Sequence, residues 1–206
     1  MNNFISVYDN ALSQEDCKSI REFFEETSDC KNPQELMCKK IGMTGSRVDK
    51  SIKDSIDVPM SFNFSYNEIN RIIMKSLASY TKKYVEENDE LRRITTWGIL
   101  DTYNLQRYYP NQGYLKTHCE NWNMDTNRRV LVWMFFLNTV TDGGGTYFSN
   151  YDLKVDAVEG RLVIWPAYWT HCHKGIVSKS QTKYIATGWY EKIEASTVIR
   201  KVKRHL

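Results

Sequence analysis

Residues 129–148 read RVLVWMFFLNTVTDGGGTYF and hold the pattern that decides the fold. The apolar run at 129–138, rich in aromatic and β-branched side chains, predicts a buried strand. The DGGG run at 142–145 predicts a tight turn, because glycine adopts backbone conformations that other residues avoid. A second short strand is expected at 145–148. The stretch therefore indicates β-structure built from short strands and glycine turns.

The same alternation of short apolar runs and turn residues continues on both sides of this stretch. Turn signals stand at residues 110–111 (PN) and 159–160 (EG). Many short strands at regular spacing predict a β-sandwich or barrel. The strands are expected at 96–109, 113–119, 129–138, 145–148, 153–156, 160–165, 171–177 and 182–192.

Two amphipathic helices are expected before residue 92. The first covers 14–27, with Ser13 as its N-cap and Asp16 three residues later to complete a capping box. The second covers 66–89, where apolar residues recur at helical spacing. The residues between them, 28–63, read as loops and short edge strands. Helices that precede a run of strands pack on one sheet face, which predicts an α+β domain that is mainly β.

The composition of the 206 residues is that of one globular domain. Hydrophobic residues make up 41% and charged residues 26%, so the chain has enough apolar surface for a core. The formal net charge is +3, and the one concentrated basic segment is RKVKRHL at 200–206. A dedicated nucleic-acid-binding protein usually carries a larger or more concentrated positive charge, so a nucleic-acid partner is not expected.

The five cysteines give no disulfide framework, because their number is odd and no CxxC motif occurs. The opening MNNFISVYDN lacks the basic and apolar regions of a secretory signal. No run approaches the roughly 20 apolar residues of a membrane-spanning helix. We therefore expect a soluble cytoplasmic protein with free thiols and no membrane partner. Its oligomeric state stays open.

Three of the four histidines lie in two short clusters, HCE at 118–120 and HCH at 171–173. In a strand, residues i and i+2 share a face, so His118 and Glu120 can reach one metal ion. Two imidazoles, one carboxylate and open positions suit non-haem Fe(II). A zinc site would favour more sulfur, and the intervening cysteines are expected to point away. By spacing alone either histidine of the second cluster can be the third ligand.

Further short motifs flank these clusters in a fixed order. They are LQRYYPNQGY at 105–114, HCE at 118–120, Arg129 before the apolar strand, GGGTYF at 143–148, EGRLVIWP at 159–166, then His173, Lys183 and Trp189. In this order they resemble the Fe(II)- and 2-oxoglutarate-dependent dioxygenases. The match is to the prolyl 4-hydroxylase-like branch, in particular its small bacterial and phage members.

The resemblance implies a double-stranded β-helix, which is a cupin-like jelly roll, supported by two N-terminal helices. A single domain would then cover residues 1–206. Its parts would be helical support and a loop insertion at 1–91, the jelly-roll core at 92–193 and a basic tail at 194–206. Loop residues 31–60 would lie at the barrel mouth, where long loops often set specificity.

The resemblance also implies the roles of individual residues. His118, Glu120 and His173 would bind iron, although Glu120 stands where the family usually has Asp. Lys183 follows His173 by the family's ten residues, which selects His173 rather than His171. The remaining implied roles are as follows: Lys183, Tyr108 and Thr146 would bind the far carboxylate of 2-oxoglutarate, with Tyr109 and Tyr114 as alternatives to Tyr108, and Trp189, Trp122 and Arg129 would line the substrate pocket.

The implied activity is hydroxylation of a C–H bond, at a prolyl or other amino-acid residue, with succinate and CO2 as co-products. The implied cofactors are Fe(II), 2-oxoglutarate and O2, with ascorbate as a reductant, and the partner is a peptide, protein or small-molecule substrate. Two alternatives remain. Glu120 in place of Asp suggests a catalytically silent jelly-roll binding module. The basic tail suggests an oxygenase acting on nucleic acid, and a small molecule is a further substrate class.

Overall fold

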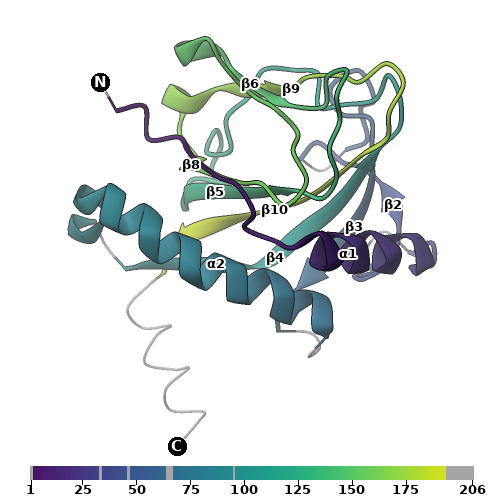
Figure 1. Cartoon of the computed structure of the whole chain (residues 1–206), viewed down its shortest axis with the longest axis horizontal. Helices are drawn as coiled ribbons and strands as arrows, with labels where there is room; N and C mark the ends of the chain where they lie inside the picture. The colour runs from purple at the N-terminus through teal and green to yellow at the C-terminus, as the bar shows by residue number, and fades with distance from the viewer. Residues whose placement is uncertain (1, 33, 46, 64–66, 95, 194–206) are drawn as a thin grey trace, which may run out of the picture.

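Two antiparallel β-sheets face each other in the computed structural model, which describes residues 2–32, 34–45, 47–63, 67–94 and 96–193 (Figure 1). The larger sheet has the strand order β1-β8-β5-β10-β4-β3-β2, and the smaller has β7-β6-β9. This is the expected jelly-roll arrangement, and it accounts for most of the predicted strands. The strands are β1 Ser6–Tyr8, β2 Lys40–Ile41, β3 Ile56–Ser61, β4 Trp97–Tyr108, β5 Arg129–Phe136, β6 Thr146–Phe148, β7 Leu153–Val155, β8 Leu162–Pro166, β9 His173–Gly175 and β10 Lys183–Lys192.

The segment expected as a strand at 113–119 is instead irregular. Its backbone changes partner every few residues: Leu115 N–H donates to Ile52, His118 N–H to His173 and Glu120 N–H to Ala167. Only isolated bridges form, between Tyr114 and Lys53 and between His118 and His173. The prediction of a strand here is wrong. The backbone of this segment bonds to several different elements and forms no continuous ladder with any one of them.

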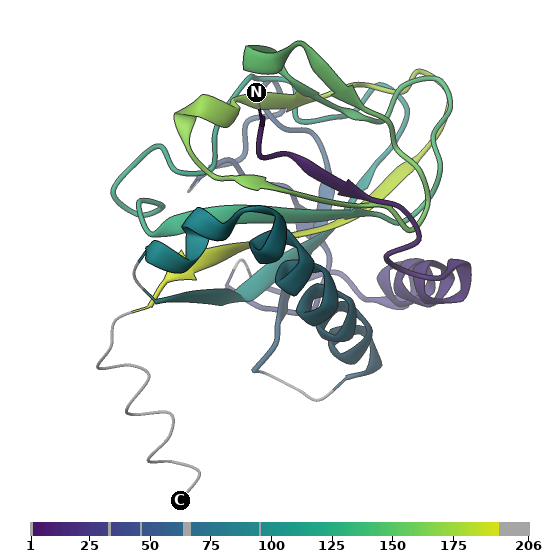
Figure 2. The ribbon, with the colours of Figure 1, turned by 60° about the vertical axis from the view of Figure 1, so that its left-hand side comes forward.

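Helices α1 (Gln14–Glu26) and α2 (Glu68–Glu87) both lie on the outer face of the large sheet (Figures 1 and 2). The predicted capping box is present, since the Ser13 side chain accepts from Asp16 N–H and the Asp16 carboxylate accepts from Ser13 N–H. Short 3-10 helices follow at η1 Asp89–Arg93, η2 Ser149–Tyr151 and η3 Trp169–His171. None of the helices in the described ranges is both long and apolar enough to cross a membrane.

Strand β10 shows how the two faces of the large sheet differ. Ala186 and Tyr190 belong to the apolar core shared with the helices, whereas Ile185 and Trp189 belong to the core between the sheets. Side chains alternate along a strand, so one strand serves both cores. At its start Lys183 pairs with Tyr108 of β4. Lys183 therefore belongs to the face that meets the small sheet.

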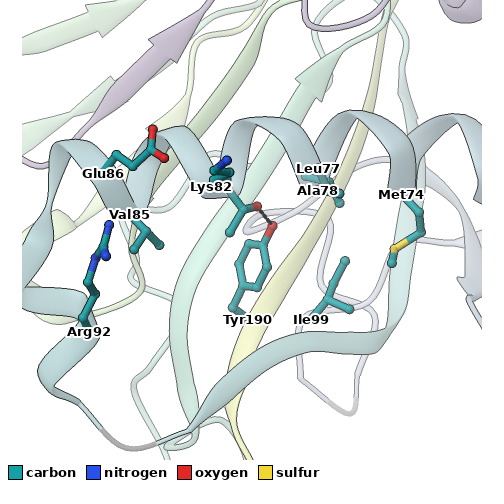
Figure 3. Close-up of a pocket in the computed structure, with 10 residues that line it drawn as sticks. Met74, Leu77, Ala78, Lys82, Val85, Glu86, Arg92, Ile99 and Tyr190 are labelled. Atoms are coloured by element: carbon teal, nitrogen blue, oxygen red, sulfur yellow. Dashed lines mark hydrogen bonds between the residues drawn. The ribbon is translucent and has the colours of Figure 1, made fainter.

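A groove of about 580 Å³ lies on the helix side of the large sheet (Figure 3). Its floor includes Ile99 and Tyr190, and its wall is α2 from Met74 to Glu86. A hydrogen bond between Tyr190 and Thr81 ties the sheet to the helix there. Because side chains alternate, this groove is separated by the sheet from the predicted iron ligands.

The expectation of five free thiols is wrong for two of them, because Cys30 and Cys38 form a disulfide. Cys30 N–H donates to Lys39 O, and Lys39 N–H donates to Ser28 O, so the loop brings residues eight apart together. The number of cysteines and the absence of a CxxC motif do not indicate that these two cysteines lie close together in the fold. Cys17, Cys119 and Cys172 are free. The predicted basic tail at 194–206 lies outside the described residues.

Candidate functional site

One large cavity, of about 1220 Å³, opens between the two sheets. It exceeds the groove of Figure 3 and the roughly 300–1,000 Å³ typical of small-ligand pockets. Residues from the 31–60 loop region line its mouth, including Lys40, Met43 and Arg47, as the sequence predicted. All nine predicted site residues line this cavity: Tyr108, His118, Glu120, Trp122, Arg129, Thr146, His173, Lys183 and Trp189.

His118, Glu120 and His173 form one cluster, with their ligand atoms within 4.8 Å of one another. Glu120 Oε1 lies 3.4 Å from His118 Nε2 and 3.6 Å from His173 Nε2. Two atoms that each lie about 2.1 Å from one ion are about 3.0–3.4 Å apart at octahedral or tetrahedral angles. The three donor atoms therefore need to move only slightly to bind a common ion.

The backbone fixes the orientation of both imidazoles. His118 Nδ1 lies 2.9 Å from Lys116 O, and His173 Nδ1 lies 2.9 Å from His171 O. A carbonyl oxygen only accepts, so each Nδ1 donates and each Nε2 is free to bind a metal on the cluster side. Burial lowers the pKa of His173, which favours the neutral form that a metal requires.

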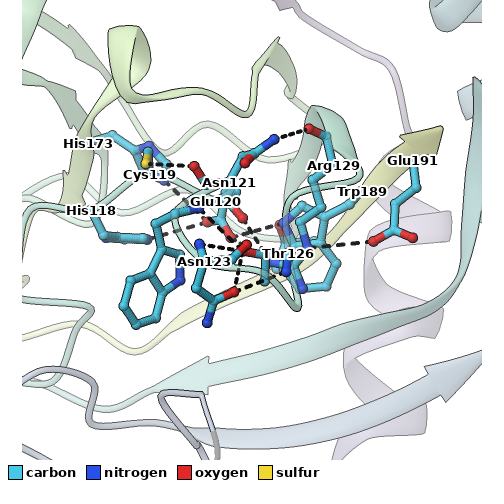
Figure 4. Close-up of polar contacts among 12 residues, drawn as sticks. His118, Cys119, Glu120, Asn121, Asn123, Thr126, Arg129, His173, Trp189 and Glu191 are labelled. Carbon is cyan, nitrogen blue, oxygen red and sulfur yellow. Dashed lines mark hydrogen bonds and ion pairs between the residues drawn. The ribbon is translucent and has the colours of Figure 1, made fainter. Parts of the chain in front are cut away.

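The two oxygens of Glu120 have different tasks (Figure 4). Oε1 faces the histidines, while Oε2 accepts from Trp189 Nε1 at 3.0 Å and from an Arg129 guanidinium nitrogen at 3.2 Å. The guanidinium also stacks on the Trp189 ring at 3.8 Å. Burial alone would raise the pKa of Glu120, but its contacts with His118 and His173 hold that pKa well below the usual range. Glu120 is thus an oriented carboxylate with one oxygen left for a metal.

These residues fit a divalent metal such as Fe(II). The set of two imidazoles and one carboxylate leaves coordination positions open, as non-haem Fe(II) oxygenases require. Orientation of each ligand by a second hydrogen bond is the usual arrangement in metal sites. The three residues that the sequence motif singled out form one cluster, and the fold adds that Arg129 and Trp189 contact Glu120.

His171 does not join the cluster, so the assumption that it shares a face with His173 is wrong. It lies in η3, and its Nε2 is 2.8 Å from Asn3 O. Its Nδ1 is 2.9 Å from the Thr170 hydroxyl. The 3-10 turn rotates the side chain away from strand alternation, and His171 instead attaches the N-terminal segment to the small-sheet side.

Lys183 lies at the inner end of the same cavity and is 6% exposed. Its ammonium is 4.6 Å from the centre of the Tyr108 ring. Among the described residues no carboxylate lies within ion-pair distance of it, and burial lowers its pKa to about 8. A buried ammonium without a counter-ion is unfavourable, so this end of the cavity favours an anion.

Tyr108 and Thr146 accompany Lys183, whereas the alternative tyrosines do not. Tyr108 and Thr146 are both buried. Tyr109 is exposed, and Tyr114 stacks on His118 with ring centres 3.7 Å apart. The opposite wall is Gly175, where a Cβ atom would lie 3.8 Å from the Lys183 ammonium nitrogen.

A buried polar chain beyond Tyr108 has no counterpart in the sequence motifs. Tyr108 OH donates to Gln106 Oε1 at 2.7 Å, and Gln106 Nε2 lies 3.4 Å from Asp57 Oδ2. Asp57 in turn forms a buried ion pair with Lys53. The i, i+2 spacing of Gln106 and Tyr108 could have indicated that their side chains lie on one face of the strand. The other members of the chain, Asp57 and Lys53, lie about fifty positions earlier and could not be found from this spacing.

The sequence matches a known family over the part of the chain that builds this site. Residues 103–191 match the model described as the 2OG-Fe(II) oxygenase superfamily. The matched segment contains all nine predicted site residues, and the proteins of this superfamily are 2-oxoglutarate-dependent dioxygenases. No curated protein matches the chain closely enough to count as a relative.

Three solved prolyl hydroxylase structures share the fold of this chain. The viral collagen prolyl hydroxylase of Paramecium bursaria Chlorella virus-1, in its 2OG complex, is 17% identical, with a TM-score of 0.64 over 92% of this chain and 97% of that one. A Pseudomonas putida prolyl-4-hydroxylase is 16% identical, with a TM-score of 0.62 over 94% and 95%. A Trichoplax adhaerens prolyl hydroxylase, in complex with a hypoxia inducible factor peptide fragment, is 16% identical, with a TM-score of 0.63 over 93% and 84%.

Proposed function

We propose that the chain binds Fe(II) through His118, Glu120 and His173 and hydroxylates a C–H bond of a prolyl or other amino-acid residue in a polypeptide. Succinate and CO2 are the co-products, and ascorbate serves as the reductant. The observation that carries the proposal is that one cavity holds both a three-donor metal cluster and a buried ammonium with no carboxylate partner among the described residues.

The residues divide the work along the cavity. Lys183 offsets the charge of the far carboxylate of 2-oxoglutarate. The Thr146 hydroxyl lines the same cavity and would donate to that carboxylate, as the Tyr108 hydroxyl would on turning from Gln106. Arg129 and Trp189 hold Glu120 so that one oxygen faces the metal. The bound iron supplies the oxygen activation chemistry, and the protein supplies orientation and a site closed from bulk water.

The size of the cavity favours a polypeptide over a small molecule. Its volume of about 1220 Å³ leaves room for a further chain segment after 2-oxoglutarate occupies the inner end. Trp122 at the rim is 65% exposed, which places a broad aromatic surface where a peptide would enter. The Trichoplax adhaerens structure was solved with a peptide fragment, which is consistent with this substrate class.

Turnover and binding assays together test the proposal. With Fe(II), 2-oxoglutarate, O2 and ascorbate, a library of proline-containing peptides should give succinate and a peptide that gains one oxygen. His173→Ala should abolish Fe(II) binding, whereas His171→Ala should retain it. A chain that binds Fe(II) and 2-oxoglutarate but never releases succinate would instead be a silent binding module.

A further inference from the structure

Two free cysteines face each other beside the iron site. His118 N–H donates to His173 O at 3.0 Å, and His173 N–H donates to His118 O at 2.8 Å. The two histidines therefore form a hydrogen-bonded antiparallel pair. The next pair outward is Cys119 with Cys172, and in such a ladder it is the non-hydrogen-bonded kind, in which Cα atoms are about 4.5 Å apart.

The side chains of this pair are in contact. The thiol of Cys119 interacts electrostatically with that of Cys172. Each is also close to a backbone carbonyl, with Cys119 Sγ 3.5 Å from Asn121 O and Cys172 Sγ 3.1 Å from Trp169 O. Both residues are partly exposed. Neither thiol belongs to the ligand cluster, although both cysteines line the same cavity.

We propose that Cys119 and Cys172 are a redox-active pair, which a peroxide converts into a cross-strand disulfide. The two S–H bonds break and one S–S bond forms. The two electrons and two protons pass to the peroxide, whose O–O bond breaks to give two molecules of water when the oxidant is hydrogen peroxide. The expected Cα separation falls within the 4.4–6.8 Å that disulfides span, so the backbone need not move far.

The bond ties the loop that carries two of the iron ligands to strand β9. In the reduced chain this loop, which includes His118 and Glu120, is held to β9 by an isolated bridge. A covalent link one residue away restricts local opening of the loop while leaving the ligand side chains in place. The sulfur pair is thereby a switchable brace for the loop that carries His118 and Glu120.

Peptide mapping tests the cross-link. The metal-free full chain is treated with excess hydrogen peroxide, the remaining thiols are alkylated, and the digest is analysed by mass spectrometry. The expected product is one peptide pair joined through Cys119 and Cys172, lost on reduction with dithiothreitol and absent in Cys119→Ser and Cys172→Ser. Cys17→Ala is the matched control and should still form the pair. Sulfinic acid at either cysteine without a cross-link, or links only between chains or to Cys30 or Cys38, would overturn the proposal.

Limited proteolysis tests the brace. Trypsin cleavage after Lys116 should slow at least about fivefold on oxidation, as expected when local opening is restricted. Dithiothreitol should restore the rate, and Cys172→Ser should show no change. A cross-linked chain cleaved at the reduced rate would overturn the bracing role. The cross-link forms without iron, so its failure is distinct from failure of the proposed function, which rests on metal and 2-oxoglutarate binding.

Discussion

Lys183 is the residue whose charge state most directly reports the proposed co-substrate site. Its pKa falls from 10.5 in the unfolded reference to about 8 in the fold, because the ammonium is buried. Between these values the unfolded chain binds more protons than the folded chain, so the free energy of unfolding rises with pH. The cost of burial is therefore present below pH 8 and relieved above it.

The metal-free chain should gain about 1–3 kcal/mol in unfolding free energy from Lys183 between pH about 7 and pH about 10. The measurement is the difference in urea denaturation between the natural chain and Lys183→Met, which cancels titrations common to both. If the difference is independent of pH, the ammonium is not desolvated and the structure is wrong at this position.

The side chain of Glu120 is one methylene longer than that of Asp, and its contacts use this extra length. Oε2 is held by Trp189 and Arg129 while Oε1 faces the histidines. Aspartate, with a shorter side chain, cannot make both sets of contacts from the same backbone. Glu120→Asp should therefore weaken Co²⁺ binding about 10–100-fold, although Asp is the usual residue of the family.

Trp189→Phe removes the indole donor to Glu120 and keeps an aromatic ring, so we expect Co²⁺ affinity to fall about tenfold. Trp133→Phe is the matched control, because its indole N–H has no partner among the described residues and faces the helix-side core. Absorption spectra of the Co²⁺ complex should change with Trp189→Phe and stay unchanged with Trp133→Phe. Equal effects would assign Trp189 to packing alone.

At the scale of elements, the strand predictions were most accurate where a strand pairs with the same neighbour along its whole length. Strand β10 was expected at 182–192 and forms at Lys183–Lys192, because β4 pairs with it from end to end and β5 pairs with it over Ile185 to Glu191. The prediction failed at 113–119 and at His171, where hydrogen bonds switch partner or a 3-10 turn intervenes. The order of the motifs was enough to predict the nine site residues that line one cavity. The contacts of Arg129 with Glu120 depend on the fold, and no local sequence pattern indicates them.

Strand β10 also depends on Gly188 for its packing. A Cβ atom there would lie 2.4 Å from the Trp133 ring, which is fully buried and cannot move aside. Gly188→Ala should lower the unfolding free energy by about 1–3 kcal/mol, as overpacked cores do. Urea denaturation measures the change.

Gly98→Ala on the adjacent strand β4 provides the comparison. Its Cβ would approach only the flexible end of Ile193, at 2.7 Å, so the change should stay within about 0.5 kcal/mol. If both variants lose the same stability, loss of strand flexibility rather than contact with Trp133 is the cause.

At the scale of the whole molecule, the proposed ligands come from both sheets. His173 on β9 and Thr146 on β6 belong to the small sheet, while Lys183 and Tyr108 belong to the large one. A metal ion and 2-oxoglutarate bound together therefore connect the two layers. Ligands that bind only the folded chain raise its stability by about 2.7 kcal/mol at a hundredfold excess over Kd.

For a chain of this length that gain corresponds to a rise in Tm of about 5–10 °C. Thermal unfolding under anaerobic conditions, with Mn²⁺ in place of Fe(II), should show this rise when 2-oxoglutarate is added after the metal. His173→Ala should lose both the metal and the 2-oxoglutarate responses. Lys183→Met should keep the metal response alone, because Lys183 is not one of the three residues of the metal cluster. An equal 2-oxoglutarate response without metal, or in Lys183→Met, would mean that the diacid binds elsewhere and that the two sheets are not joined through it.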